Sequence, residues 1–177
     1  MKAPEIFLDL DGVLADFDRH LTKAYQKANG RPDFDKLDYA WWTSMPPTAG
    51  AKEFYAFCTS QAETRFLTSP VMSPDCFAGK AQFVTDFTGD KFALTKLIIA
   101  TDKELIAAPN RILIDDSQSK VDRWLKAGGS AVLHDGDFAN TKLLLRNILN
   151  RFVYTKPEPA KTPNKTPNKK PFNRFST

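Results

Sequence analysis

Short apolar runs alternate along the chain with longer segments whose apolar residues recur at helical spacing. The apolar runs, which predict strands, lie at residues 6–8, 65–67, 94–99, 111–114 and 131–133. The segments at helical spacing, which predict helices, lie at residues 18–29, 51–59, 74–87, 119–127 and 141–152. Strands that alternate with helices are typical of a parallel sheet with helices on both faces, so the pattern predicts an α/β fold.

The region from residue 31 to 61 interrupts this alternation. It holds two adjacent tryptophans, Trp41 and Trp42, and two adjacent prolines before the helix predicted at 51–59. The regular order of strand and helix resumes only near residue 65. This pattern predicts an insertion between the first two strands.

Two aspartates, Asp9 and Asp11, follow the first apolar run directly. Alternation along an extended chain directs both side chains to the same face, at the strand end where open α/β sheets bind their ligands. Like charges so close together raise the pKa of one group unless a cation lies between them, and oxygen ligands suit Mg²⁺. The alternative is an ordinary turn, because Asp11 precedes Gly12 and Asp-Gly is a common turn dipeptide.

Three further strand ends carry groups that phosphate chemistry would use. Thr68 and Ser69 offer hydroxyls, and Lys103 offers a point charge for a phosphate, although a solvated lysine is the alternative. Asp115 and Asp116 repeat the opening pattern, and one of them would complete a metal shell. Their alternative role is at the start of a helix, where acidic residues are stabilised by the macrodipole.

Taken in order, these segments resemble the four motifs of the haloacid dehalogenase (HAD) superfamily over about residues 4 to 150. Within it, the 5′(3′)-deoxyribonucleotidases share the opening Asp-Leu-Asp-Gly-Val-Leu-Ala-Asp-Phe at 9–17, Thr-Ser-Pro at 68–70, Asp-Lys at 102–103 and Ile-Asp-Asp at 114–116. The segment between the first two motifs is shorter than is usual in that family. The resemblance implies a Rossmann-like core at 1–17 and 65–155 and a helical cap at 18–64.

The resemblance also implies a mechanism. Asp9 would attack phosphorus to form an aspartyl phosphate, and Asp11 would act first as general acid and then as general base. Mg²⁺ would be bound by Asp9, the backbone carbonyl of Asp11 and Asp116, with Asp115 as a direct or water-mediated partner.

The phosphate oxygens would be bound by four groups in the same motifs. These are the side chains of Thr68, Ser69 and Lys103 and the backbone N–H of Gly12. Phe17 follows the catalytic pair at the position where that family places an aromatic residue in the sugar and base pocket. Trp41 and Trp42 would stack on a base, or would form the core of the cap instead.

Charge is divided unevenly along the chain. The net charge is +4, but residues 156–177 hold six basic residues against one acidic residue, which leaves about −1 for the rest. This Pro- and Lys-rich tail has too few apolar residues to fold, so it is expected to be disordered, with weak nucleic-acid contact possible. The near-neutral body is not typical of a DNA-binding domain.

Length and composition predict a small cytoplasmic enzyme. The 177 residues are 42% hydrophobic, which suits one core domain, and no apolar run approaches the ~18 residues of a membrane span. The first residues enter a strand directly, so no secretory leader is expected. Cys58 and Cys76 lack metal-ligand spacing and are expected to be reduced.

The sequence therefore predicts a Mg²⁺-dependent phosphatase of nucleoside monophosphates, with a small nucleotide as its partner and no membrane contact. Two alternatives stay open. One is a 3′-phosphatase acting on nucleic-acid ends, with the tail supplying phosphate affinity. The other is a catalytically silent nucleotide-binding protein.

Overall fold

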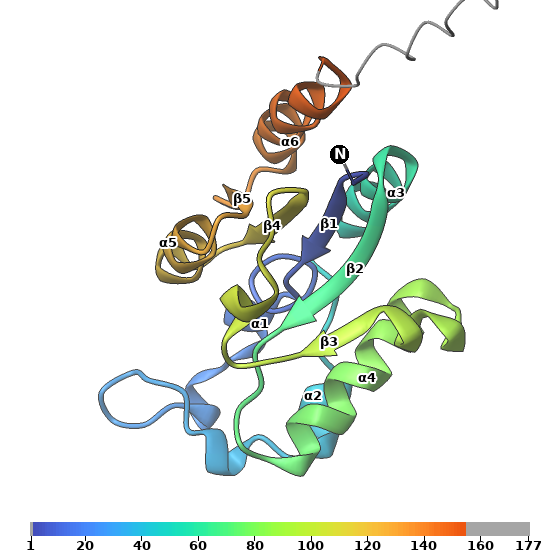
Figure 1. Cartoon of the computed structure of the whole chain (residues 1–177). Coiled ribbons are helices and arrows are strands. Elements are labelled where there is room, and N and C mark those ends of the chain that lie inside the picture. The colour runs from blue at the N-terminus through green and yellow to red at the C-terminus, as the bar shows by residue number, and fades with distance from the viewer. Residues whose placement is uncertain (1, 155–177) are drawn as a thin grey trace, which may run out of the picture.

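The computed structural model describes residues 2–154 and contains one five-stranded parallel sheet of order β3-β2-β1-β4-β5 (Figure 1). The strands are β1 (Glu5–Leu8), β2 (Glu63–Thr68), β3 (Leu97–Ile99), β4 (Arg111–Asp115) and β5 (Ser130–Leu133). The predicted α/β fold with a parallel sheet is confirmed. The predicted tail at 156–177 lies outside the described residues.

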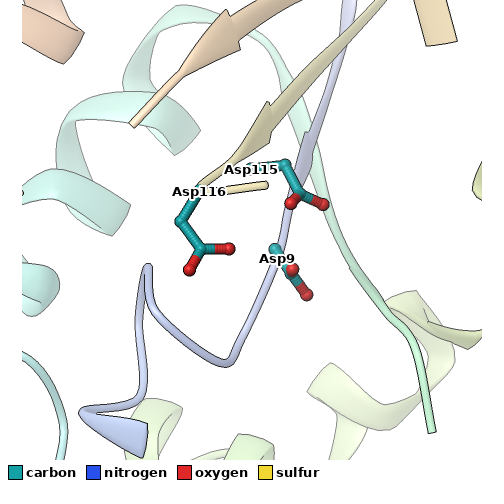
Figure 2. A group of neighbouring side chains, drawn as sticks. All are labelled: Asp9, Asp115 and Asp116. Carbon is teal, nitrogen blue, oxygen red and sulfur yellow. The ribbon is translucent and has the colours of Figure 1, made fainter. Parts of the chain in front are cut away.

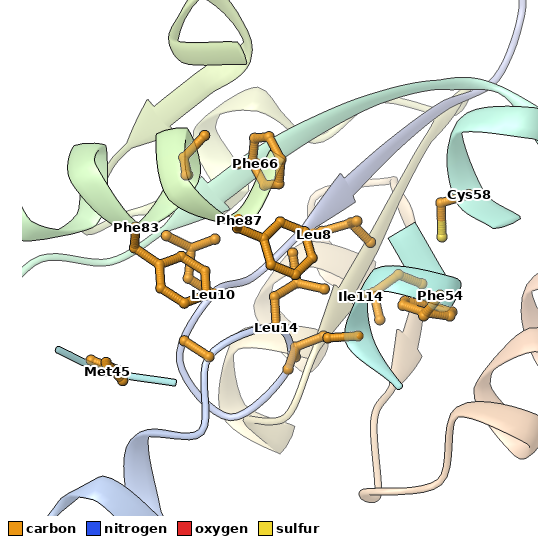
Figure 3. Packing of buried hydrophobic residues seen from close by; sticks show 14 of the residues in the cluster. Leu8, Leu10, Leu14, Met45, Phe54, Cys58, Phe66, Phe83, Phe87 and Ile114 are labelled. Carbon is orange, nitrogen blue, oxygen red and sulfur yellow. The ribbon is translucent and has the colours of Figure 1, made fainter. Parts of the chain in front are cut away.

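Helices cover both faces of the sheet. The helices α3 (Ala51–Gln61), α4 (Pro74–Thr88) and α6 (Phe138–Tyr154) contribute buried side chains to the same hydrophobic cluster as Ile6 and Leu8 of β1. Figure 3 shows part of this cluster, including Leu8, Phe54 of α3 and Phe83 of α4. Phe7, between those two residues, belongs to a second cluster with Trp124 of α5 (Gln118–Lys126). Alternate residues of a strand point to opposite faces, so β1 is apolar throughout because both of its faces are buried.

The register brings the ends of three strands level. Leu8 of β1 lies opposite Phe66 of β2 on one side and Ile114 of β4 on the other. The strand order reverses between β1 and β4, which is where open α/β sheets form a ligand-binding crevice at their carboxyl edge. The residues that follow β1, β2 and β4 therefore converge on one place.

The long segment between β1 and β2 differs from the prediction at its start. A helix was expected at 18–29, but α1 (Phe17–His20) ends after one turn and the short 3-10 helix η1 (Lys23–Tyr25) follows. The chain then turns back, with Asp33 N donating to Tyr25 O at 2.8 Å. Ala24 and Ala28 are exposed, so a longer helix would have buried little apolar surface to offset this alternative pairing.

The rest of the insertion is compact. The 3-10 helix η2 (Phe34–Lys36) and helix α2 (Tyr39–Thr43) precede α3. The helix predicted at 51–59 is confirmed by α3. Phe54 of α3 stacks on Phe138 of α6 with ring centroids 4.7 Å apart, and α3 packs against β2. Helix α3 thus lies against the sheet. The division of the chain into a core and a cap at 18–64 stays a prediction.

One strand is shorter than predicted. The run at 94–99 forms a strand only over β3, because the 3-10 helix η3 (Lys91–Lys96) occupies its first half. The Asp90 side chain accepts a hydrogen bond from Phe92 N at 2.9 Å and stabilises that turn. A further 3-10 helix, η4 (Lys103–Ile106), connects β3 to β4. Over the described residues, none of the helices is long and apolar enough to span a membrane.

Close packing of α2 on α4 generates a stability prediction. Gly79 lies in α4 where an added Cβ would overlap the Cβ of Trp42. Gly79→Ala should therefore lower the melting temperature, because overpacking costs about 1–3 kcal/mol whereas the gain in helix propensity is only about 1 kcal/mol. Thermal unfolding measures the change in melting temperature. The variant Ala78→Gly, at the exposed neighbouring position, measures how much the difference in helix propensity between alanine and glycine contributes. A higher melting temperature for Gly79→Ala would contradict the packing.

Candidate active site

Asp9 is buried directly after β1, with 1% of its surface exposed. Its Oδ1 accepts a hydrogen bond from the backbone N–H of Leu10 at 2.8 Å and lies 2.9 Å from Nζ of Lys103. Its Oδ2 lies 3.2 Å from Nζ of Lys120. Two ammonium groups and a backbone donor therefore fix the orientation of this carboxylate.

Lys103 lies at the start of η4 and is buried, with 1% of its surface exposed. Its Nζ donates to Asp115 Oδ2 at 2.6 Å in addition to its contact with Asp9. The sequence assigned Lys103 to the phosphate. The structure shows it bridging two carboxylates, one from the end of β1 and one from the end of β4.

Asp11 is bound by a lysine that the sequence analysis missed. Nζ of Lys80, on α4, lies 2.5 Å from Asp11 Oδ2 and 2.8 Å from Thr68 Oγ1. Lys80 is 2% exposed and lies on the buried face of α4, between Cys76 and Val84 at four-residue spacing. A charged residue within an apolar helical face was the signal that could have revealed it.

Lys120 was also missed. It lies in the first turn of α5, which begins after Ser117, and its ammonium is 3.8 Å from Asp115 Oδ1 in addition to its contact with Asp9. Basic residues are disfavoured in the first turn of a helix by the macrodipole. A lysine at that position, one turn after two aspartates, was therefore a usable signal.

Three carboxylates form a candidate metal-binding cluster. Oxygen atoms of Asp9, Asp115 and Asp116 lie within 4.8 Å of one another (Figure 2). Asp115 is buried, and its Oδ1 accepts a hydrogen bond from Ser117 N at 2.9 Å, whereas Asp116 is exposed. Asp116 therefore has the carboxylate that is open to an external ligand.

Gly12 lies against this cluster. It has φ of +78°, and a Cβ there would overlap the carboxylate of Asp116, so both the backbone conformation and the space require glycine. Its N–H donates to Ala15 O at 2.9 Å within the turn. This N–H is therefore not free for the phosphate contact that the sequence predicts, and the contribution of Gly12 is the close approach of Asp116.

The pKa values of the first two aspartates are shifted in opposite directions. Burial alone would raise the pKa of Asp9, but Lys103, Lys120 and Lys80 together hold it well below its usual range. Burial raises the pKa of Asp11, and the charge of Asp9 adds to this effect against the opposing charge of Lys80. Asp9 is thus the more readily ionised of the pair and Asp11 the more readily protonated.

The second acidic pair is also perturbed. Burial and then the charge of Asp9 raise the pKa of Asp115 to about 6, against the lowering effect of Lys103. The same two causes raise the pKa of Asp116. A divalent cation among these carboxylates would favour their ionised forms and reverse both shifts.

Two hydroxyl residues, Thr68 and Ser69, lie at the end of β2. Thr68 is fully buried at the end of β2, and its Oγ1 accepts the hydrogen bond from Lys80. The Oγ of Ser69 is buried and has no hydrogen-bond partner within the described part of the chain. Because most buried hydroxyls in proteins are paired, an unpaired one at a strand end is consistent with a place for a ligand.

The predicted aromatic pocket is tightly packed. Phe17 contacts Trp41 and Trp42, with ring centroids 5.5 and 6.1 Å away. The two tryptophans are 4% and 2% exposed, and Lys80 Nζ lies 5.5 Å from the ring centroid of Trp42. The three aromatic side chains are thus linked to Asp11 through Lys80. The burial of both indoles is consistent with the alternative that they form the core of the predicted cap.

Both cysteines are free thiols. Cys58 and Cys76 are buried, and burial raises the pKa of each, to about 12 for Cys58. Neither belongs to the carboxylate cluster. Their state agrees with the expectation of reduced, unreactive side chains.

No protein-family model and no curated protein matches the sequence. Solved structures with a similar chain path include the following three. An uncharacterized protein from Corynebacterium glutamicum has 14% identity, covers 84% of this chain and 96% of its own, and gives a TM-score of 0.46. A HAD hydrolase of family IA, variant 3, from Entamoeba histolytica has 16% identity, coverage of 82% and 89%, and a TM-score of 0.49. A predicted HAD-like family hydrolase from Porphyromonas gingivalis has 15% identity, coverage of 81% and 98%, and a TM-score of 0.37.

The ion pairs of Asp9 predict a pH-dependent stability. In metal-free buffer at pH 7, Asp9→Asn should lower the free energy of unfolding by about 3 kcal/mol, the low end for breaking a buried pair. Because the pKa of Asp9 is depressed in the fold, its contribution is complete above the unfolded-state pKa near 4 and is lost as the pH falls toward the folded-state pKa. Urea unfolding between pH 7 and pH 3 should show the difference in unfolding free energy between the two proteins begin to narrow below about pH 4. A difference that grows on acidification would contradict this.

Proposed function

We propose that this chain is a Mg²⁺-dependent phosphoric monoester hydrolase of the HAD superfamily that acts on nucleoside monophosphates, with 5′-deoxyribonucleotides as the preferred class. The proposal is carried by one observation, which is that two ammonium groups contact buried Asp9 at the end of β1 while Asp11, two residues later, is contacted by Lys80. The opposite directions of the two pKa shifts agree with this arrangement. A phosphoryl-transfer site of this kind needs an ionised nucleophile and a neighbouring proton donor. The order of the four motif segments and the α/β fold support the same assignment.

In the proposed reaction, an oxygen of Asp9 attacks phosphorus while the bond from phosphorus to the nucleoside oxygen breaks. Asp11 donates its proton to that leaving oxygen, so the nucleoside departs as a neutral alcohol. Asp11 then accepts a proton from water, whose oxygen attacks phosphorus and displaces the Asp9 carboxylate. Inorganic phosphate is released, and Asp9 and Asp11 return to their starting states.

The acidic cluster fits a magnesium ion. Its oxygens lie within 4.8 Å of one another, and the exposed Asp116 carboxylate is open to a ligand. We assign Mg²⁺ to Asp9, Asp116 and the backbone carbonyl of Asp11, with Asp115 as a direct or water-mediated partner. When bound, Mg²⁺ would supply positive charge that offsets the repulsion between phosphate and Asp9.

The phosphate is assigned to Ser69, Thr68 and Lys103. The Ser69 hydroxyl is buried without a partner among the described residues, and the preceding residue, Thr68, ends β2. Lys103 would contribute positive charge, and its ion pairs orient the side chains of Asp9 and Asp115. This arrangement places positive charge and hydrogen-bond donors around the transferring group before the reaction begins.

The nucleotide preference rests on Phe17, Trp41 and Trp42 together with the resemblance of the motif segments. Phe17 is half-buried, and the indole N–H of Trp41 has no partner within the described residues. An apolar wall against C2′ would disfavour ribose by leaving its hydroxyl unpaired. A cytoplasmic location and weak nucleic-acid contact through residues 156–177 complete the proposal.

Release of inorganic phosphate from a substrate panel tests the function. The panel holds deoxyribonucleotides, ribonucleotides, sugar phosphates and 3′-phosphorylated oligonucleotides, each assayed with Mg²⁺ and with excess EDTA. Mononucleotides should be hydrolysed only with Mg²⁺. Release confined to oligonucleotide ends would favour the 3′-phosphatase, and release from none would favour a silent nucleotide-binding protein.

Substitution of the two aspartates should separate their roles. Asp9→Asn should abolish phosphate release, because it removes the nucleophile, and Asp11→Asn should reduce kcat by more than about 10²-fold with substrate binding retained. Steady-state kinetics and nucleotide titration measure the two effects. Asp35→Asn, at an exposed position of η2, is the matched control. Near-normal turnover by Asp9→Asn would refute the mechanism.

Sugar selectivity is a separate prediction. Deoxyribonucleoside 5′-monophosphates should have kcat/KM values about 10- to 100-fold above the matching ribonucleotides, the range that one unpaired hydroxyl can supply. Phe17→Ala should narrow the difference mainly by weakening hydrolysis of the deoxynucleotide. Phe34→Ala, at an exposed aromatic of the same segment, should leave it unchanged. Equal values for dUMP and UMP would contradict the pocket and leave the phosphatase proposal intact.

A further inference from the structure

Both oxygens of the proposed nucleophile face an ammonium group. Oδ1 of Asp9 is contacted by Lys103 at 2.9 Å, and Oδ2 is contacted by Lys120 at 3.2 Å. A carboxylate held in this way is well ordered. Each of its oxygens already faces one cation, so a metal ion that binds Asp9 must share or replace one of these contacts.

The two lysines differ in their freedom to move. Lys103 has 1% of its side chain exposed and a 2.6 Å contact with buried Asp115, so its departure would leave an unpaired buried charge. Lys120 has 24% of its side chain exposed, and its contacts with Asp9 and Asp115 are longer, at 3.2 and 3.8 Å. Only Lys120, of these two, can reach water without such a cost.

The Lys120 ammonium contacts two members of the acidic cluster. Asp9 and Asp115, which it contacts, are two of the three carboxylates whose oxygens lie within 4.8 Å of one another. An ammonium group and a divalent cation cannot both occupy the space that faces these oxygens. The lysine is therefore a cation tethered by its own helix, α5, in front of the proposed metal ligands.

We propose that Lys120 is a built-in competitor of the metal ion, which binds Asp9 and Asp115 in the metal-free protein and is displaced to solvent when Mg²⁺ binds. This inference rests on the metal site of the proposed function. It assigns Lys120 two effects. The lysine keeps the acidic cluster neutralised and ordered without metal, and it weakens Mg²⁺ binding because its contacts must first break.

Calorimetric titration of the metal-free full chain with Mg²⁺ gives the first measurement. Lys120→Met should bind Mg²⁺ about tenfold or more tightly than the unmodified protein, since one cation at this range changes cation binding to a carboxylate by about that factor. Lys120→Arg should retain the weaker binding, because it restores a competing charge. Lys126→Met, at an exposed position of the same helix, should match the unmodified protein.

Chemical labelling of the unmodified protein gives the second measurement and needs no variant. Acetylation by an N-hydroxysuccinimide ester, read by mass spectrometry, should increase at Lys120 when Mg²⁺ is added, because the displaced ammonium becomes accessible. Lys126 should react equally with and without Mg²⁺. The same labelling with Ca²⁺ or with Na⁺ at matched ionic strength distinguishes Mg²⁺ binding at the acidic cluster from nonspecific screening of charge by salt.

The outcomes distinguish this inference from the function on which it rests. Equal Mg²⁺ affinity in Lys120→Met, or tighter binding without a change in Lys120 labelling, would overturn the displacement and leave the metal site intact. Absence of Mg²⁺ binding in every protein tested would overturn the metal site and this inference with it. Tighter binding together with increased labelling would establish it.

Discussion

The crowding of four carboxylates at one edge of the sheet is the constraint on which the site depends. Asp9, Asp11, Asp115 and Asp116 would repel one another, and burying an ion without compensation costs several kcal/mol. Lysines from three successive connections between strands compensate the negative charge of these aspartates. Lys80 comes from α4 after β2, Lys103 from η4 after β3, and Lys120 from α5 after β4. Each crossover therefore brings one ammonium group to the acidic residues after β1, and the parallel topology delivers the compensating charges together with the acids.

The unequal distribution of these lysines explains how two aspartates two residues apart acquire different chemistry. Asp9 is contacted by two ammonium groups, and its pKa is held low despite complete burial. Among the residues that the structure describes, Lys80 is the one ammonium group that contacts Asp11, and burial together with the charge of Asp9 raises the pKa of Asp11. The same logic of environment, rather than residue type, separates nucleophile from acid in other enzymes with paired carboxylates. Asp115 shares both Lys103 and Lys120 with Asp9, and burial together with the charge of Asp9 raises its pKa to about 6.

Sequence patterns predicted the strands and the acids because both are local. A buried strand such as 111–114 shows as an apolar run, and the aspartates that end it are adjacent in sequence. Lys80 and Lys120 were not found because their partners lie 69 and 111 residues away, and only the register of the sheet brings them together. The prediction of a helix at 18–29 was wrong because it relied on the local pattern alone. Its spacing was helical, but Ala24 and Ala28 bury no surface, so the local pattern lacked the tertiary contact that would have maintained it.

Packing between the insertion and α4 links the aromatic group to the acid. Trp42 of α2 approaches α4 where Gly79 leaves room, and the next residue, Lys80, is the one that contacts Asp11. The same Lys80 ammonium lies 5.5 Å from the Trp42 ring centroid, so one lysine contacts both the indole and the carboxylate. A movement of α2 relative to α4 would therefore change the surroundings of Lys80 and, through it, the pKa of Asp11. The tryptophans need not touch a substrate to matter in the proposed reaction, because their packing fixes the cation that lowers the pKa of the proposed acid against the effect of burial.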